Sequence, residues 1–192
     1  MRSSGSTPSL PPERPIPLLL LVAHEDHPKA CTGRRLLHRG KVREVARLSG
    51  LVARPVLLDP HAARPLSRED REAAEVGGLL AVDCSWNRLA RRGGFPTTVE
   101  ASPPGGAVRR RLPFLIAANP QHFGRLGELN TVEALSAALY VLGGPRAAAH
   151  LLEGFRGGAT FLELNRDRLD RYAGAPTARD VADAERALFG ST

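Results

Sequence analysis

LPFLIAANPQHFGRLGELNTVEALSAALYVLG, residues 112–143, is the stretch that decides the fold. It begins with Leu112–Ala118, an unbroken apolar run that Asn119-Pro120 ends. This pattern predicts a strand that is covered on both faces, because a strand with one solvated face would alternate apolar and polar residues. The loop 121–128 should therefore lie between two buried elements, where a protein can hold a ligand in fixed geometry.

The second half of this stretch predicts a helix with defined ends. Asn130 is placed to cap the first turn, Glu133 is the reciprocal partner of a capping box, and Gly143 ends the helix. Large apolar residues recur along one stripe, and small apolar residues occupy the other side. The helix should therefore pack against more than one neighbour.

The rest of the chain alternates short apolar runs with helical segments. Three further strands are predicted, at Pro17–Ala23, Pro55–Leu58 and Leu79–Val82. Two further helices are predicted, at Arg34–Leu48 and Ser67–Gly77, and Asp70 stands at the capping-box position of the second helix. This alternation implies right-handed crossovers and a mainly parallel sheet. Residues 1–16 are expected to form a flexible tail, and Asn87–Arg111 a long basic excursion.

Composition limits the class of protein. The chain has 192 residues with 42% hydrophobic content, which suits one soluble domain or two small ones with a shared core. Its formal charge of +7 comes almost entirely from arginine, whose planar fork pairs with phosphate. Nucleic acid is therefore the first partner to consider, although arginine enrichment can also reflect the nucleotide composition of the source genome.

Neither a membrane segment nor a disulfide framework is expected. Leu18–Val22 is the strongest apolar run near the N-terminus, and it is far too short to span a bilayer. The cysteines are Cys31 and Cys84 alone. A cytoplasmic location without a membrane partner follows as the expectation.

Polar groups follow the predicted strands where each one ends. Asp59-Pro60, Asp83–Trp86 and Asn119-Pro120 would all lie along the carboxyl edge of a parallel sheet, where such folds bind ligands. No G-x-G-x-x-G or G-x-x-x-x-G-K-[ST] motif opens a helix. The sequence therefore gives no support to a Rossmann dinucleotide site or a P-loop.

Trp86 is the only tryptophan and has two interpretations. Its indole can form a wall for an adenine ring or a stacked base, or it can plug the end of the sheet while Asp83 caps the turn. Cys84 is expected to be a small buried side chain, because no histidine lies nearby in the sequence to activate it.

One cluster of possible metal ligands does not have the spacing of a metal site. It comprises His24, Asp26, His27 and Cys31. A structural zinc site needs four convergent nitrogen or sulfur donors, usually in paired motifs. No metal is therefore expected, and solvated turn residues explain the group.

Six ordered motifs carry a resemblance to a known family. They are His27-Pro28-Lys29-Ala30-Cys31-Thr32-Gly33, Leu57-Leu58-Asp59-Pro60, Val82-Asp83-Cys84-Ser85-Trp86, Arg111-Leu112-Pro113 leading to Ala117-Ala118-Asn119-Pro120, Leu129–Ala134, and Phe161-Leu162-Glu163-Leu164-Asn165. From Pro17 to Tyr172 the chain thereby resembles the small-subunit ribosomal RNA aminocarboxypropyltransferase family of ribosome biogenesis.

The resemblance implies both a fold and an activity. The fold would be α/β, with a mainly parallel SPOUT-like sheet that contains a deep trefoil knot and a small helical C-terminal domain. We expect a tail at 1–16, a sheet domain at 17–119 and a mainly helical domain at 120–192 that completes the cofactor site. The activity would be transfer of the 3-amino-3-carboxypropyl group of S-adenosylmethionine, not its methyl group, to N3 of a modified, pseudouridine-type uridine in small-subunit rRNA.

At matching positions the resemblance also assigns the cofactor site. The adenine would be enclosed by Leu58, Pro60, Trp86, Leu112 and Leu129. The polar edges of the nucleoside would be held by the backbone of Val82, Leu112 and Gly127. The aminocarboxypropyl tail would be held by Thr32, Asn130 and Thr131.

Asp83 would sit near the transferred carbon and is the candidate catalytic residue. It would either help to remove the N3 proton, since a uracil imide is neutral near pH 7, or balance the sulfonium charge. Two other functions fit the same sequence. A knotted RNA methyltransferase would share the fold and the RNA partner, and a non-catalytic assembly factor would keep only the RNA-binding surface.

Basic residues are concentrated beside the predicted cleft. The candidate RNA-binding residues are Arg34, Arg35, Arg39, Lys41, Arg64, Arg109, Arg110, Arg111 and Arg125. Their positive potential would draw a phosphate backbone across the sheet edge, and the alternative is a set of solvated arginines spread over the surface. The expected partner is small-subunit rRNA or the pre-ribosomal small subunit, bound by a monomer.

Overall fold

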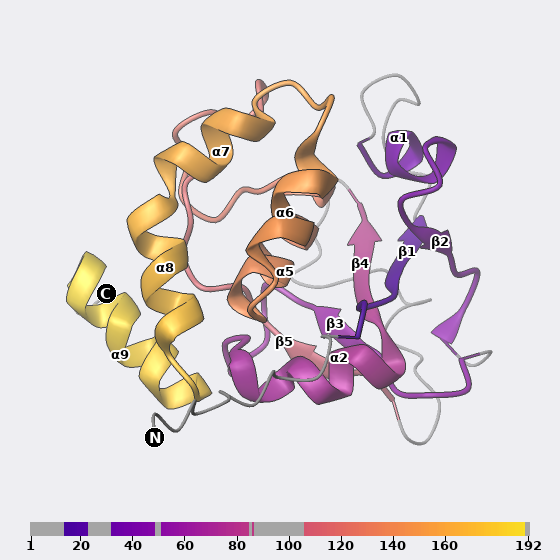
Figure 1. The fold of residues 1–192 in the computed structure, drawn as a ribbon, viewed down its shortest axis with the longest axis horizontal. Helices are drawn as coiled ribbons and strands as arrows, with labels where there is room; N and C mark the ends of the chain where they lie inside the picture. Colours follow the sequence, from indigo (N-terminus) through magenta and orange to yellow (C-terminus); the bar gives the residue numbers. More distant parts are fainter. Residues whose placement is uncertain (1–13, 23–31, 49–50, 85, 87–105, 191–192) are drawn as a thin grey trace, which may run out of the picture.

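The computed structural model describes residues 14–22, 32–48, 51–84, 86 and 106–190 (Figure 1). Within them, five strands form one sheet in the order β2-β1-β4-β3-β5, and every neighbouring pair is parallel. The strands are β1 (Leu18–Val22), β2 (Arg43–Glu44), β3 (Val56–Leu58), β4 (Leu79–Asp83) and β5 (Val108–Arg110). The predicted α/β class and parallel sheet are confirmed.

The central strand, β4, is paired on both sides. Leu80 stands opposite Leu19 of β1 and Leu57 of β3. Because side chains alternate along a strand, these leucines share one face of the sheet, where they pack with Val45 and Leu48. The alternate residues of the same strands join a larger apolar cluster with the helices. The sheet is therefore covered on both faces.

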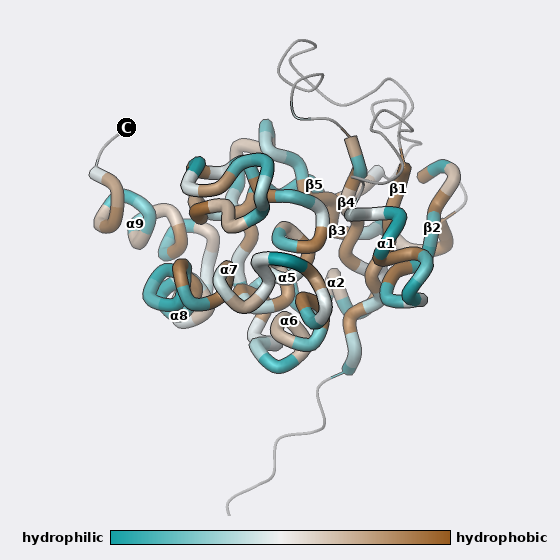
Figure 2. The backbone as a smooth tube through the Cα atoms, turned by 90° about the horizontal axis from the view of Figure 1, so that it is seen from above, coloured by the Kyte–Doolittle hydropathy of each residue, from teal (hydrophilic) through white to brown (hydrophobic). Residues whose placement is uncertain are grey.

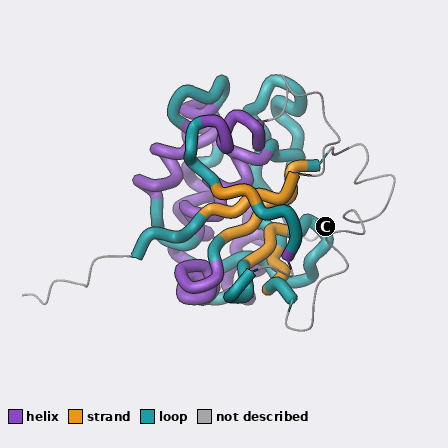
Figure 3. Tube along the Cα trace, turned by 90° about the vertical axis from the view of Figure 1, so that its right-hand side faces the viewer, coloured by secondary structure: helices purple, strands orange, loops and turns teal. Residues whose placement is uncertain are grey.

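The helices lie mostly on one side of the sheet. The helical segments of the described part are α1 (Thr32–His38), the 3-10 helix η2 (Arg68–Asp70), α2 (Arg71–Gly77), α5 (Thr131–Val141), α6 (Pro145–Leu152), α7 (Gly158–Leu164), α8 (Arg166–Gly174) and α9 (Ala178–Phe189). Figure 2 shows α5–α9 gathered beside the strands, and Figure 3 shows most of the helical tube behind or beside the strands. None of these helices is long and apolar enough to cross a membrane.

Helix α5 occupies the centre of this arrangement and has the predicted ends. Asn130 Oδ1 accepts a hydrogen bond from the Glu133 N–H at 2.9 Å, and the Glu133 carboxylate accepts one from the Asn130 N–H at 3.0 Å. Gly143, at φ +92°, follows the last turn. The helix contacts α1, α6, α8 and β4, as expected for a helix that is apolar on two sides. The capping box predicted at Ser67 and Asp70 is also present.

The predicted strand at Leu112–Ala118 is wrong. The fifth strand is β5, just before this run, and the run itself is a loop whose Ile116 forms only an isolated bridge with Leu126. Its backbone finds hydrogen-bond partners outside the sheet, because the Ala117 N–H donates to Arg125 O at 2.9 Å and Asn165 binds both polar groups of Ile116. The run is apolar because it packs under helices, and apolar periodicity does not distinguish that burial from a strand.

The predicted helix at Arg34–Leu48 is only partly present. Helix α1 covers Thr32–His38, and Gly40, at φ +64°, follows it. The chain then pairs with β1 as the short strand β2, and the Val45 N–H donates to Leu20 O at 2.8 Å. Val42, Val45 and Leu48, which suggested a helical stripe, thus reach the core from the turns on either side of this strand. Residues 1–13 and 87–105 of the predicted tail and excursion lie outside the described residues.

Glu69 links η2 to the N-terminus of α9. Its Oε1 accepts hydrogen bonds from the Ala178 N–H at 2.8 Å, from Arg64 Nη2 at 2.7 Å and from the Ser67 hydroxyl at 3.0 Å. The Ala178 hydrogen bond, followed by that of Arg64, lowers the pKa of Glu69 to about 2. A carboxylate at this position also complements the positive end of the helix dipole.

We expect Glu69 to make the fold sensitive to acid. An unfolded glutamate titrates near 4.5, so the stability gained from charged Glu69 is present above that pH and is lost as the pH falls towards 2. Glu69→Gln should therefore lower the free energy of unfolding at pH 7. The difference in this free energy between wild type and Glu69→Gln should shrink as the pH falls from 4.5 to about 2. Urea unfolding at several pH values measures this, with exposed Glu163→Gln as the control. If the difference in unfolding free energy between wild type and Glu69→Gln stays constant from neutral pH down to about pH 2, this prediction is wrong.

Candidate active site

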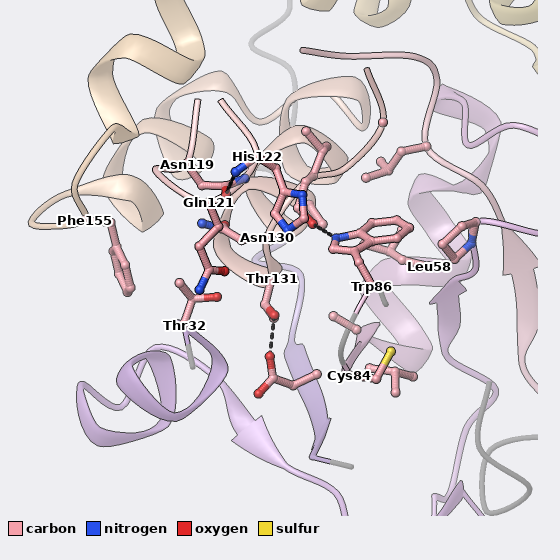
Figure 4. A pocket seen from close by; sticks show the side chains of 18 of the residues that line it. Thr32, Leu58, Cys84, Trp86, Asn119, Gln121, His122, Asn130, Thr131 and Phe155 are labelled. Atoms are coloured by element: carbon pink, nitrogen blue, oxygen red, sulfur yellow. Dashed lines mark hydrogen bonds between the residues drawn. The ribbon is translucent and has the colours of Figure 1, made fainter. Parts of the chain in front are cut away.

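A cleft of about 780 Å³ opens at the carboxyl ends of β3 and β4 (Figure 4). The sheet contributes the residues at and after these strand ends, α1 contributes Thr32 and Arg35, and the remaining walls come from segments 111–114, 119–122 and 127–131 with Phe155 and Arg156. Segments distant in the sequence therefore meet here. The ligand edge predicted from the polar strand ends is where the cleft lies.

The cleft brings together every residue that the resemblance assigns to the cofactor. Thr32, Leu58, Pro60, Val82, Trp86, Leu112, Gly127, Leu129, Asn130 and Thr131 all line it, together with Asp83. Figure 4 shows Trp86 and Leu58 at one end, Thr32 at the other, and Asn130 and Thr131 between them. The cleft thus has an apolar end and a polar end. Cys84, half-buried, lines it too.

Asp83 is held between two helices at the end of β4. Its side chain is buried, and Thr131 Oγ1, at the start of α5, donates to Asp83 Oδ1 at 2.6 Å. On the other side lies Gly33 of α1, where an added Cβ would come within 2.6–2.9 Å of the carboxylate atoms. The carboxylate is therefore fixed in position, and a side chain larger than hydrogen at residue 33 would displace it.

Trp86 both lines the cleft and packs on the sheet. Its Nε1–H donates to Leu129 O at 2.8 Å, and its ring packs against the apolar cluster that contains Leu19 and Leu57. The hydrogen bond fixes the indole plane against the loop that precedes α5. The packing agrees with the interpretation of Trp86 as a plug at the end of the sheet, and its place in the cleft leaves its role as an adenine wall a prediction.

Glu133 joins two walls of the cleft. Its buried carboxylate accepts hydrogen bonds from the Ala118 N–H at 2.9 Å, from Asn119 Nδ2 at 2.7 Å and from the Asn130 N–H at 3.0 Å. Burial raises the pKa of Glu133, and these donors act in the opposite direction. Sequence patterns predicted Glu133 only as a helix cap, so its link to residues 118 and 119 was missed.

Comparison with known proteins shows what the chain is similar to. The sequence model of a family described as "Ribosome biogenesis protein, C-terminal" matches residues 56–189. The 16S rRNA aminocarboxypropyltransferase of Methanopyrus kandleri is 46% identical over 170 residues, which cover 85% of this chain and 93% of that protein. The 18S rRNA aminocarboxypropyltransferase of Schizosaccharomyces pombe is 36% identical over 172 residues, 90% of this chain and 57% of that protein.

A solved structure is similar over nearly the whole chain. The SAM-dependent rRNA:acp-transferase Tsr3 from Vulcanisaeta distributa superposes with a TM-score of 0.75 and 30% sequence identity, over 92% of this chain and 99% of that one. This chain belongs to the ribosome biogenesis family. The family resemblance inferred from the six motifs is thereby confirmed.

Several cleft residues of this family member were not predicted as site residues. Asn119, Gln121, His122, Phe155 and Arg156 all line the cleft. Asn119-Pro120 gave a signal, because it ends an apolar run at the ligand edge. Phe155 and Arg156 gave none, since they lie between α6 and α7 and reach the cleft only through tertiary packing. His24, Asp26, His27 and Cys31 lie outside the described residues.

Three of the predicted RNA-binding residues in α1 and the turn after it, Arg35, Arg39 and Lys41, donate to backbone carbonyls at the end of α6 and in the loop after it. Arg39 donates to Glu153 O at 2.9 Å and to Gly154 O at 3.1 Å, and Lys41 Nζ donates to His150 O at 2.6 Å. Arg35 also lines the cleft, and Arg34 is exposed and makes an interaction of its own. Basic side chains thus attach α1 to carbonyls at the C-terminal end of α6, where cations are favoured.

The remaining predicted RNA-binding arginines form ion pairs within the chain. The pairs are Arg64–Glu69 at 2.7 Å, Arg109–Asp59 at 3.1 Å, Arg110–Asp70 at 2.9 Å, Arg111–Glu185 with one contact at 2.8 Å, and Arg125–Glu128 at 3.2 Å. Glu185 holds the pKa of Arg111 above its ordinary value. Sequence reasoning placed these arginines near the cleft but did not identify their partners.

We expect Glu133→Ala to destabilise the protein strongly. The change leaves three donors without their acceptor, two of them buried, and each buried group costs roughly 1–3 kcal/mol. The free energy of unfolding should fall by about 2 kcal/mol or more, and by about 1 kcal/mol in Glu133→Gln, which keeps one acceptor oxygen. Urea unfolding measures both against Glu163→Ala, an exposed glutamate on α7. Equal effects of Glu133→Ala and Glu163→Ala would show that the network contributes nothing.

Proposed function

We propose that this protein transfers the 3-amino-3-carboxypropyl group of S-adenosylmethionine to N3 of a modified, pseudouridine-type uridine in small-subunit rRNA during ribosome biogenesis. One observation carries the proposal: all the positions that match the cofactor residues of the family line one cleft. The relatives named above, 16S and 18S rRNA aminocarboxypropyltransferases, support the same activity.

The cleft has the size and chemistry that S-adenosylmethionine requires. Small-molecule sites typically measure about 300–1,000 Å³, and this cleft measures about 780 Å³. Its apolar end suits an adenine ring, with Trp86 and Leu58 as walls. Its polar end suits a charged amino-acid tail, because Thr32, Asn130 and Thr131 supply hydroxyl and amide groups.

The residues of the chain would act mainly by positioning. Bound in the cleft, S-adenosylmethionine supplies a carbon on a sulfonium leaving group, so transfer of that carbon to N3 breaks its C–S bond and releases methylthioadenosine. The backbone of Val82, Leu112 and Gly127 would hold the polar edges of the nucleoside. Trp86 at one end and Thr32 at the other would fix which carbon of the sulfonium meets the nucleophile.

Asp83 is the proposed catalytic residue. Because Thr131 and Gly33 fix its carboxylate, it can accept the N3 proton of the uracil without reorganisation, or balance the sulfonium charge. Either role needs a carboxylate at the polar end of the cleft. No covalent intermediate is required, since the leaving group is already activated.

The expected RNA partner is small-subunit rRNA, bound by a monomer in the cytoplasm. The proposed RNA contacts are Arg34, Arg35, Arg39, Lys41, Arg64, Arg109, Arg110, Arg111 and Arg125. We further propose that segment 17–119 forms the sheet domain and 120–192 the helical one, and that the sheet is SPOUT-like with a deep trefoil knot. The resemblance supports the knot, and a crystal structure that traces residues 87–105 tests it.

Product analysis tests the proposed activity. The protein is incubated with S-adenosylmethionine and small-subunit rRNA, and the modified nucleoside and the sulfur product are identified by mass spectrometry. We expect methylthioadenosine and a uridine that carries the aminocarboxypropyl group, and no product with Asp83→Ala. Adenosylhomocysteine with a methylated nucleoside would instead show a methyltransferase, and binding of rRNA without any sulfur product an assembly factor.

Trp86→Ala should weaken cofactor binding. Loss of a base–aromatic stacking contact costs about 1–3 kcal/mol, so the affinity for S-adenosylmethionine should fall about tenfold or more. Trp86→Phe, which keeps an aromatic face but loses the hydrogen bond to Leu129, should lose less. Calorimetry measures the affinities, and circular dichroism confirms folding. A folded Trp86→Ala protein with unchanged affinity would remove Trp86 from the adenine site.

A further inference from the structure

Phe123 is an exposed aromatic residue in a loop that forms part of the cleft. It is 64% exposed, and the two residues before it, Gln121 and His122, line the cleft, where Figure 4 labels both. Single exposed apolar residues are common on protein surfaces. Phe123 differs from them by its position, because a large substrate whose reacting atom enters the cleft meets the protein at this rim.

The backbone on both sides of Phe123 is held by hydrogen bonds. The His122 N–H donates to Asn119 Oδ1 at 3.0 Å. The Gly124 N–H donates to Ala117 O at 2.8 Å, and the turn there places Gly124 at φ +81°, which favours glycine. The loop thus presents the ring of Phe123 to solvent from an anchored position, which reduces the entropy lost when a ligand binds.

The two phenylalanines that line the cleft already have partners for their rings. Phe114 packs edge-to-face on Phe189, with ring centroids 6.0 Å apart, and the guanidinium of Arg35 lies 4.7 Å from the centroid of Phe155. Among the residues that the structure describes, no aromatic ring or guanidinium stacks on Phe123 in this way. The ring of Phe123 is therefore available to a planar ligand.

A cation lies close to Phe123 in the same loop. The side chain of Arg125 is 63% exposed, and its acid partner Glu128, 3.2 Å away, is 33% exposed. An exposed pair of this kind contributes little, so a phosphate can replace the acid. An exposed aromatic ring beside an exposed arginine suits unpaired RNA, because the base stacks on the ring and its phosphate pairs with the cation.

The proposed reaction itself requires an unpaired nucleotide at the cleft. The acceptor atom N3 lies on the Watson–Crick edge of uracil, which a base pair occupies, so the uridine has to be unpaired and turned out of its stack to react. A neighbouring base thereby loses a stacking partner at the mouth of the cleft. An aromatic side chain at this point can take the place of the lost partner.

We propose that Phe123 stacks on an RNA base next to the uridine that enters the cleft, while Arg125 binds the adjacent phosphate. The inference rests on the proposed function, because it places the same rRNA substrate on the protein. It adds to the basic RNA contacts a residue that contacts a base. Phe123 thereby selects unpaired RNA over a duplex, in which the faces of the stacked bases are covered.

Binding of the full-length protein to two RNAs at several salt concentrations tests the proposal. The RNAs are small-subunit rRNA and a fully paired RNA duplex. Phe123→Ala should lower the affinity for the rRNA about tenfold and leave the affinity for the duplex nearly unchanged. It should also keep the slope of log affinity against log salt concentration, because stacking releases no counterions, whereas Arg125→Gln should flatten that slope. Phe123→Trp should bind the rRNA as wild type does, and Phe123→Leu, apolar but not aromatic, should bind it as Phe123→Ala does.

Val76 provides a matched control. It is 66% exposed on α2, just before β4 begins, and so lies at the end of that strand away from the cleft. Val76→Ala should bind both RNAs as wild type does. Calorimetry with S-adenosylmethionine should give the same affinity for wild type, Phe123→Ala and Val76→Ala, because neither change touches the cofactor site. Loss of S-adenosylmethionine binding in Phe123→Ala would show that Phe123 only supports the wall of the cleft, and the proposal would be overturned.

Each other outcome has a definite meaning. If Phe123→Ala binds the rRNA as tightly as wild type, or weakens both RNAs equally, no base stacks on Phe123 and the proposal is overturned. Full rRNA affinity in Phe123→Leu overturns it too, because leucine has no aromatic face. If sedimentation shows a wild-type dimer that Phe123→Ala dissociates, the ring belongs to a contact between two copies of the chain instead. If Phe123→Ala selectively weakens the rRNA but wild type releases no methylthioadenosine, the base contact stands and the proposed function fails.

Discussion

The buried carboxylate of Glu133 is the interaction on which the cleft depends. Burying an anion is costly, and here the Ala118 N–H, the Asn119 side chain and the Asn130 N–H offset the cost. Two of these donors belong to the loop that closes one wall, and the third begins the helix that forms the other. The cleft therefore keeps its width because one side chain binds both walls.

The parallel sheet provides the other half of the site. Because β3 and β4 run in the same direction, their carboxyl ends bring Leu58 and Asp83 to one edge. Helix α5 packs on β4 and presents Thr131 to Asp83, and α1 presents Gly33 to the same carboxylate. The catalytic candidate is thus oriented by three elements, none of which is adjacent to another in the sequence.

The sequence predicted those parts of the structure that depend on residues close together in the chain. The strands that end near Asp59 and Asp83 follow from apolar runs, and the cap of α5 follows from its capping residues. The motif resemblance gave the cofactor positions, all of which line the cleft, but it did not give every lining residue. The Leu112–Ala118 run was assigned wrongly, because its backbone finds partners in Arg125 and Asn165 that no periodicity reveals. Ion pairs between distant residues were missed for the same reason.

The arginines differ in the free energy that contact with phosphate would cost, because each must first give up its ion pair within the protein. The side chains of Arg64 and Arg125 are 53% and 63% exposed, and an exposed pair contributes only about 0–1 kcal/mol, so exchanging its acid for a phosphate is inexpensive. Arg110 and Arg111, at 15% and 22%, are held by buried acids, and breaking such a pair leaves a charge without compensation. Of the proposed RNA contacts, the exposed arginines can therefore exchange their acids for phosphate, while Arg110 and Arg111 keep theirs, hold the strand and loop that shape the cleft, and contribute through their positive field.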